Sequence, residues 1–183
     1  MKFDRILFGA RYFVFIIYLL CDSEALFKFI NIKCNCFEQS FCEFKNCELK
    51  VLGRGIVGLN LYAKVNQLPI KKTKVVLALF RRFNGYRPFL FNVSVDLCFF
   101  LKHKKRFPFV NLVYEGIQNF TNANHSCPFN HDIIVDRMVL DDKMISKAPV
   151  PNGFYKLSIN VQTDGIWRGE VDVHAEVNLG FER

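Results

Sequence analysis

The chain has 183 residues, about the length of one domain, and carries 25 Lys and Arg against 17 Asp and Glu, a formal charge of +8. Hydrophobic residues make up 51% and charged residues 23%, which excludes a disordered, a collagen-like or a coiled-coil chain. The unusual feature is the 21 Phe residues, since Leu is ordinarily the commonest residue.

The first 25 residues have the pattern of a secretory signal peptide. A basic start is followed by the apolar run Phe13–Leu20 and by the small-x-small cleavage signal Ser23–Ala25. The alternative is a membrane anchor, but the uncharged run ends at Asp22, short of the roughly 20 residues that a spanning helix needs. We therefore expect a signal peptide at 1–25, one mature domain at 26–183, and a secreted, extracellular protein.

The number of cysteines also fits a secreted protein. Cleavage would remove three basic and three acidic residues, leaving 25 − 3 = 22 Lys and Arg against 17 − 3 = 14 Asp and Glu. Six of the seven Cys would remain. An even number of Cys in a secreted chain predicts disulfides, and six allow fifteen connectivities. We predict Cys34–Cys47, Cys36–Cys42 and Cys98–Cys127, with the first two pairs around one loop.

Two further features bear on modification and metal binding. N-x-S/T sequons predict glycosylation at Asn92, Asn119 and Asn124. The Cys34–Cys47 segment and the mixed His125–Asp132 segment could instead supply metal ligands, but their spacing lacks the paired C-x2-C form of zinc sites. We expect disulfides, no metal and no cofactor.

The strands are predicted from period-two alternation of apolar and polar residues. In chain order they run from Phe27 to about Cys34 and then over 59–65, 75–80, 89–97, 155–161 and 170–177. The segment 75–80 is apolar at every position, which predicts burial on both faces. The Asn84-Gly85 pair that follows is a hairpin signal, because both residues tolerate positive φ.

One stretch has helical rather than strand periodicity. Apolar residues between Phe109 and Ile117 recur every three or four positions, which predicts a short amphipathic helix near 107–120 with Pro108 in its first turn. No internal repeat or low-complexity linker is visible. The predicted fold is all-β, an immunoglobulin-like antiparallel β-sandwich with one short helix, and a barrel is the alternative.

The chain contains, in order, five characteristic segments: 29–34 (FINIKC), 47–50 (CELK), 83–89 (FNGYRPF), 95–98 (VDLC) and 124–132 (NHSCPFNHD). Together they resemble a large insect family of small secreted domains of unknown function that includes the CheB gustatory proteins. That family is similar to the ML lipid-recognition domains, β-sandwiches that hold a lipid between their sheets. The resemblance covers nearly all of the mature chain. It matches cysteines at Cys34, Cys47, Cys98 and Cys127, with Cys36 and Cys42 as additions.

The resemblance implies a monomeric, non-enzymatic binding protein for a lipid or apolar semiochemical, acting in chemosensation or lipid transport. Candidate pocket residues are the apolar positions of one parity on the predicted strands: Leu77, Leu79, Phe89, Phe91, Val93, Val95, Leu157, Ile159, Val171 and Val173. The alternative is a secreted protein- or glycan-binding module with a fully packed core.

The sequence contains no recognisable catalytic motif, and Asp141-Asp142 is interpreted as a solvated pair in a turn. The basic run Lys102–Arg106 would suggest nucleic acid in a cytosolic protein, but behind a signal peptide it is expected to be a solvated loop. The other interpretation of this run is a contact with an anionic surface, either lipid headgroups or sulfated glycans. A receptor is a further candidate partner.

Overall fold

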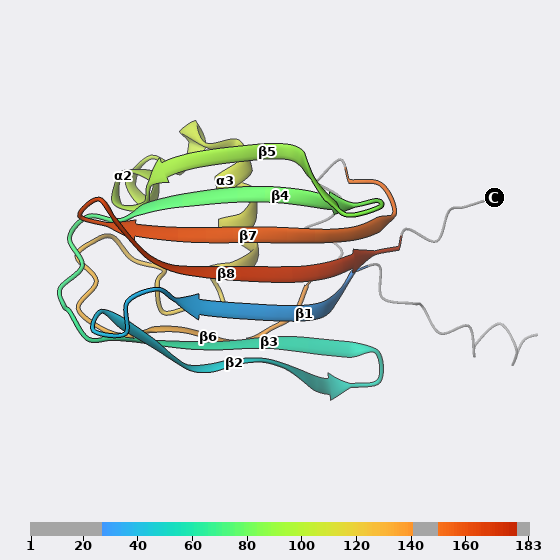
Figure 1. Ribbon diagram of the computed structural model, residues 1–183, viewed down its shortest axis with the longest axis horizontal. Coiled ribbons are helices and arrows are strands. Elements are labelled where there is room, and N and C mark those ends of the chain that lie inside the picture. The colour runs from blue at the N-terminus through green and yellow to red at the C-terminus, as the bar shows by residue number, and fades with distance from the viewer. Residues whose placement is uncertain (1–26, 141–149, 179–183) are drawn as a thin grey trace, which may run out of the picture.

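Two antiparallel β-sheets face each other in the computed structural model, which describes residues 27–140 and 150–178 (Figure 1). The strands are β1 (Phe27–Cys36), β2 (Cys42–Gly53), β3 (Ile56–Val65), β4 (Lys74–Arg82), β5 (Tyr86–Asp96), β6 (Ile133–Met138), β7 (Gly153–Thr163) and β8 (Ile166–Val177). The predicted β-sandwich is confirmed, and the strands form two separate sheets rather than a barrel. The predicted signal peptide and Asp141-Asp142 lie outside the described residues.

The larger sheet has five strands in the order β1-β8-β7-β4-β5. β4 lies inside it, between β7 and β5. On the face of β4 that points away from the other layer, Ala78 is buried but Val76 and Phe80 are only half-buried, so the predicted burial on both faces is confirmed in part. The hairpin predicted at Asn84-Gly85 joins β4 to β5, and Phe83 N–H donates to the Gly85 carbonyl oxygen at 2.8 Å. A second hairpin joins β7 to β8 through Asp164 and Gly165, both at positive φ, as a two-residue turn of this type requires.

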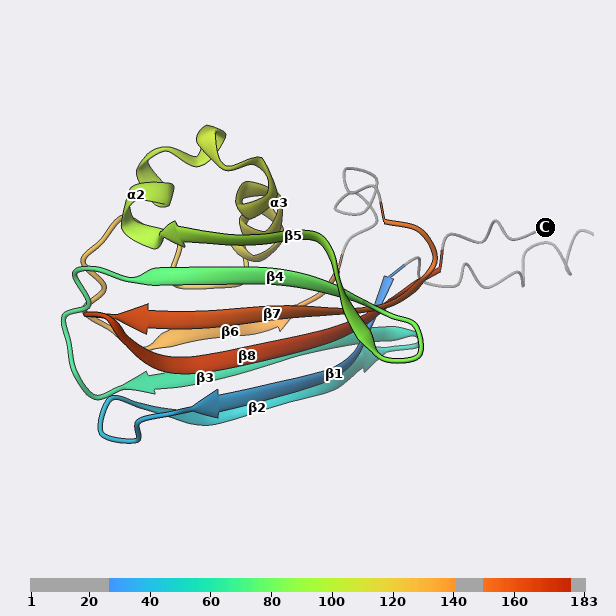
Figure 2. The same cartoon turned by 45° about the horizontal axis from the view of Figure 1, so that its top comes forward.

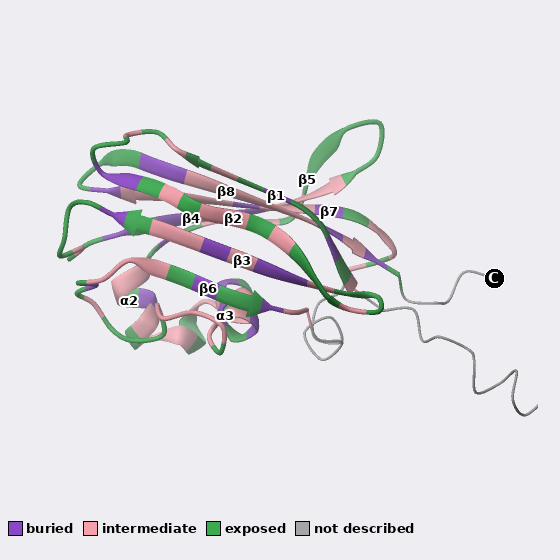
Figure 3. Cartoon of the chain, turned by 90° about the horizontal axis from the view of Figure 1, so that it is seen from below, coloured by how far each residue is buried: buried purple, intermediate pink, exposed green. Residues whose placement is uncertain are grey.

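The second layer combines a three-stranded sheet with helices. The sheet order is β2-β3-β6, and seen from below in Figure 3 the helices α2 (Leu97–Lys102) and α3 (Pro108–Ile117) lie beside β6. Between these helices is a short 3-10 turn, η1 (Lys104–Arg106). The predicted helix near 107–120 corresponds to α3, with Pro108 in its first turn. Among the described residues, no helix is long and apolar enough to cross a membrane.

The structure corrects three local predictions. Residues 42–47, expected to be loop, begin β2, because their side chains alternate across a strand paired with β3. β6 was not predicted, because its sequence IIVDRM does not alternate between apolar and polar residues. β5 ends at Asp96 rather than near 97, because the Asp96 side chain caps α2 by accepting a hydrogen bond from Phe99 N–H at 2.9 Å.

Two main hydrophobic clusters fill the space between the layers. One lies between β4, β5 and the two helices and includes Leu77, Val95, Phe100 and Tyr114. The other joins β1, β3 and β6 through the side chains of Phe29, Ile32, Leu59, Leu61, Val135 and Met138. Between the two clusters, the inner side chains at the centre of β7 and β8 are only half-buried.

Candidate ligand-binding cavity

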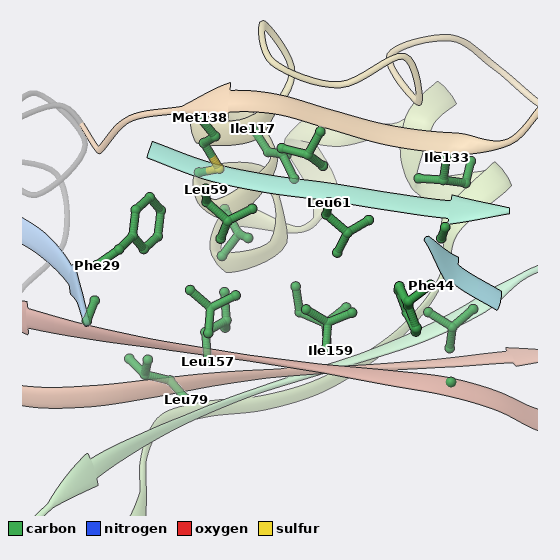
Figure 4. A pocket seen from close by; sticks show the side chains of 18 of the residues that line it. Phe29, Phe44, Leu59, Leu61, Leu79, Ile117, Ile133, Met138, Leu157 and Ile159 are labelled. Atoms are coloured by element: carbon green, nitrogen blue, oxygen red, sulfur yellow. The ribbon is translucent and has the colours of Figure 1, made fainter. Parts of the chain in front are cut away.

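A cavity of about 390 Å³ lies between the two sheets. Its walls are apolar side chains from every strand and from α3. In Figure 4, Leu59 and Leu61 of β3 point toward Leu157 and Ile159 of β7, while Ile117 of α3 closes the back. Pockets for small molecules commonly measure about 300–1,000 Å³, so the volume suits a small ligand.

The exposure of the lining residues shows that the sheets do not pack against each other here. Leu157, Ile159 and Val171 face the opposite sheet from the centre of the larger one, yet all three are only half-buried. By contrast, Leu77, which lies under the helices on neighbouring β4, is only 5% exposed. A well-packed core leaves few voids larger than one water molecule. The half-buried side chains therefore mark a real gap in the packing.

Aromatic rings form much of the wall. The Phe residues of the lining are Phe27, Phe29, Phe41, Phe44 and Phe91, from β1, β2, β5 and the turn between β1 and β2. Other Phe residues have different roles: Phe100 and Phe129 are core residues, whereas Phe37 and Phe83 are exposed. Part of the Phe excess is thus used for cavity walls, where rings provide area and shape selectivity.

Among the described residues that line the cavity, only two side chains carry an oxygen or nitrogen atom, and both are already engaged. The Tyr155 hydroxyl donates to the Pro151 carbonyl oxygen at 2.6 Å, and burial raises the pKa of this hydroxyl. Arg168 is paired with Glu38, and its Nε donates to Thr163 Oγ1 at 2.8 Å. The described lining therefore offers a ligand apolar contact and shape, and both of its polar side chains are bonded elsewhere.

The ten predicted pocket residues divide into two groups. Six line the cavity: Leu79, Phe91, Leu157, Ile159, Val171 and Val173. The other four are elsewhere, three of them because helices α2 and α3 cover the part of the sheet from which they project. Leu77, Val93 and Val95 pack in the cluster under the helices, and Phe89 packs beside Tyr155 and Val177. That any of them contacts a ligand stays a prediction.

The opposite wall was missed by the sequence analysis. It consists of Leu59, Leu61, Ala63 and Val65 of β3 with Ile133, Val135 and Met138 of β6. The β3 residues share one parity of a strand that was predicted, so alternation could have identified them. The β6 residues had no such signal, because Ile133-Ile-Val135 is apolar at consecutive positions.

The three predicted disulfides are all present, at Cys34–Cys47, Cys36–Cys42 and Cys98–Cys127. The first two join β1 of the larger sheet to β2 of the smaller one. The third joins α2 to the segment before β6. The first two cross-links therefore hold the two sheets together at β1 and β2, and the third ties α2 to the chain that enters β6. All six thiols are unavailable as metal ligands.

The mixed His125–Asp132 segment has a structural role. Nε2 of His125 and Nε2 of His131 lie 2.7 Å apart, and Asp132 accepts from the Val65 N–H and the Tyr62 hydroxyl. Those two bonds, the backbone one first, lower the pKa of Asp132. In the described part of the chain, no group of three or more His, Cys, Asp or Glu side chains is placed to hold a metal ion.

The predicted surface sites are accessible. The three sequon residues, Asn92, Asn119 and Asn124, are all exposed, and their glycosylation stays a prediction. In the basic run, Lys104 Nζ lies 4.3 Å from the centroid of the Tyr114 ring, and the Arg106 guanidinium lies 5.8 Å from that of Phe99. Two of the cations therefore rest on aromatic faces rather than extending from a loop.

Comparison with known proteins gives one family match. Residues 75–157 match the model of a family described as a protein of unknown function (DUF1091). This segment runs from the start of β4 into β7 and includes α3, Cys98 and Cys127. No curated protein matches the chain. In this segment, which is less than half of its length, the chain is similar to a domain family whose description states no activity.

Proposed function

We propose that the protein is a secreted, non-enzymatic binding protein for a lipid or apolar semiochemical, which it holds between its two β-sheets. The observation that carries the proposal is the 390 Å³ apolar cavity, in whose described lining both polar side chains are already engaged. The resemblance to the CheB-containing family and to ML lipid-recognition domains supports the same ligand class and suggests a role in chemosensation or lipid transport.

The energetics of an empty cavity also favour an occupant. An unfilled apolar void leaves its lining side chains without packing partners, which costs the folded state burial and dispersion energy. A ligand that filled the void would restore much of this through burial and dispersion contacts. Binding of this kind needs no reactive side chain.

Ligand binding can be tested directly on secreted protein. Native mass spectrometry and lipid extraction should detect a co-purified apolar molecule, and the delipidated protein should bind a fluorescent fatty acid that unlabelled lipids displace. The variant Val171→Phe adds a ring inside the cavity and should weaken binding roughly tenfold or more. Ser94→Phe adds a ring on the exposed face of β5 and should leave binding unchanged.

The alternative is a module that binds proteins or glycans through its surface. That alternative includes a fully packed core, and the half-buried Leu157 and Ile159 do not favour such a core. If no lipid class bound the delipidated protein and nothing apolar co-purified, the proposal would be wrong and the surface module would be preferred. Equal loss of binding in Val171→Phe and Ser94→Phe would show that the probe binds outside the cavity.

A further inference from the structure

Two hairpin tips at one end of the sandwich expose large apolar side chains. Figures 1 and 2 place the β2–β3 and β4–β5 connections at the end where the described chain begins at Phe27 and ends after β8. On the first tip, Val51 is 75% exposed and Ile56 46%, and on the second Phe83 is 56% exposed. Burying such side chains is favourable by about 25 cal/mol per Å², so the two tips are suited to an apolar partner.

The same two hairpins are uniformly basic. Residues 49–58 and 80–90 contain Lys50, Arg54, Arg81, Arg82 and Arg87 and no Asp or Glu. Within the described residues, no ion pair is formed by any of these five cations. Exposed apolar side chains beside unneutralised cations match a bilayer surface that contains anionic lipids. There each cation is attracted by headgroup charge while the apolar groups leave water.

This end of the molecule is also an end of the cavity. Phe27, Val150 and Val177 line the cavity, and Val150 is close in sequence to Asn152. The Asn152 carbonyl oxygen accepts a hydrogen bond from Arg81 Nη2 of the β4–β5 hairpin at 2.9 Å. A surface that contacted both hairpin tips would therefore lie against the end of the cavity at which Phe27 and Val177 pair.

We propose that the protein docks on anionic lipid bilayers with its β2–β3 and β4–β5 hairpin tips, with this end of the cavity facing the membrane. The inference extends the proposed function by naming the surface with which a lipid carrier would exchange its ligand. The contact with anionic lipid is thereby placed at the hairpin tips rather than at the basic run Lys102–Arg106. In that region the exposed rings of Phe99 and Phe109 already stack, on His103 at 4.3 Å and on Phe91 at 5.5 Å between centroids.

Vesicle flotation tests the docking. The protein should bind vesicles of phosphatidylcholine with phosphatidylserine more tightly than vesicles of phosphatidylcholine alone, and salt should weaken the binding. The double variant Arg54→Gln with Arg87→Gln should lose roughly 30-fold in affinity, since each cation near the surface contributes about a factor of five. The matched control, Lys102→Gln with Lys105→Gln, removes the same charge from α2 and η1 and should lose little.

Two further variants test how much the exposed apolar side chains contribute to vesicle binding. Val51→Asp and Phe83→Ser should weaken vesicle binding, and circular dichroism should show unchanged folding because both residues are exposed. A greater loss in the Lys102 and Lys105 variant than in the Arg54 and Arg87 variant would overturn the proposal. So would equal binding to both kinds of vesicle.

Fluorescence provides a second readout that reports orientation. The single Trp of the chain, Trp167, lies at the start of β8, at the end opposite the hairpin tips (Figure 1). Vesicles should therefore leave its emission unchanged, whereas the added Trp of Val51→Trp should shift to the blue. A blue shift of Trp167 in the wild type would show that the wrong end docks. Displacement of a fluorescent fatty acid, measured without vesicles, reports ligand binding alone. A failure of membrane docking can therefore be distinguished from a failure of ligand binding.

Discussion

The guanidinium carbon of Arg168 lies 4.3 Å from the centroid of the Phe41 ring, at the end of the cavity beside the turn from β1 to β2. Arg168 is only 6% exposed. Its charge is balanced by Glu38, whose side chain is far more accessible. The pair closes this end of an otherwise apolar cavity with a neutralised charge.

This asymmetry predicts different costs for removing the two partners. Glu38→Gln leaves a buried cation without its carboxylate and should destabilise the protein by about 3 kcal/mol. Arg168→Met leaves only a carboxylate that water can reach, keeps contact with Phe41, and should cost about 1 kcal/mol. Urea unfolding midpoints measure both, and a greater cost for Arg168→Met would contradict the explanation.

Two leucines on adjacent strands test whether the cavity persists in solution. Leu77→Ala removes atoms from a packed cluster and should cost about 3 kcal/mol. Leu157→Ala removes atoms that already face the void and should cost about 1 kcal/mol in the delipidated protein. Differential scanning calorimetry of the two variants gives the comparison. Equal losses would show that the sheets collapse onto one another when no ligand is present.

His174 makes stability depend on pH. Its Nδ1 lies 2.9 Å from the Tyr86 hydroxyl, and burial, its main influence, lowers the pKa of the imidazole. Lys156 and Lys33 lower it further, and Asp172 opposes them. The unfolded chain therefore takes up a proton first, so stability is full above the ordinary pKa of about 6.5 and is lost as the pH falls below it.

The variant His174→Gln removes this titration. Urea midpoints measured from pH 7.5 to pH 5 should fall less steeply for the variant than for the wild type. His125→Gln serves as a control, because His125 is exposed and bonds only within its own segment. An identical pH dependence in His174→Gln and the wild type would refute the assignment.

The disulfides should differ in their contributions. Cys98–Cys127 has a sequence separation of 29 and Cys36–Cys42 one of 6, so the chain-entropy estimate gives roughly 3.6 and 2.2 kcal/mol. Replacing Cys98 and Cys127 together by Ser should therefore lower the free energy of unfolding more than replacing Cys36 and Cys42 by Ser. Guanidinium titrations without reductant measure the free energy of unfolding of both variants. A larger decrease for the Cys36 and Cys42 variant would contradict the prediction.

Local patterns predicted the elements that have strong periodicity. β5, β7 and β8 alternate along most of their length, and α3 has apolar residues at helical spacing, so each was found from the residues themselves. β2 was missed because its polar and charged residues obscured the alternation beside four closely spaced cysteines. The Asp164-Gly165 turn between β7 and β8 was a usable hairpin signal that was not applied.

Candidate pocket residues were predicted only in part, because parity tells which face of a strand is apolar but not what covers that face. Leu77 and Leu157 both lie on the inner face of the larger sheet. Only tertiary structure places α3 over the first and an open gap over the second. Phe91 lies at the border, where it lines the cavity and also stacks on Phe109.

The sequence by itself determined the all-β class and the short helix, because alternation and helical spacing are local features. It also predicted the three disulfide pairs, but the tertiary structure decided among the fifteen possible connectivities. Whether the rich supply of Phe would fill a core or surround a space was decided only by the tertiary structure. Three strands and a helix cannot cover five strands completely, so the inner side chains of β7 and β8 are left facing an apolar cavity.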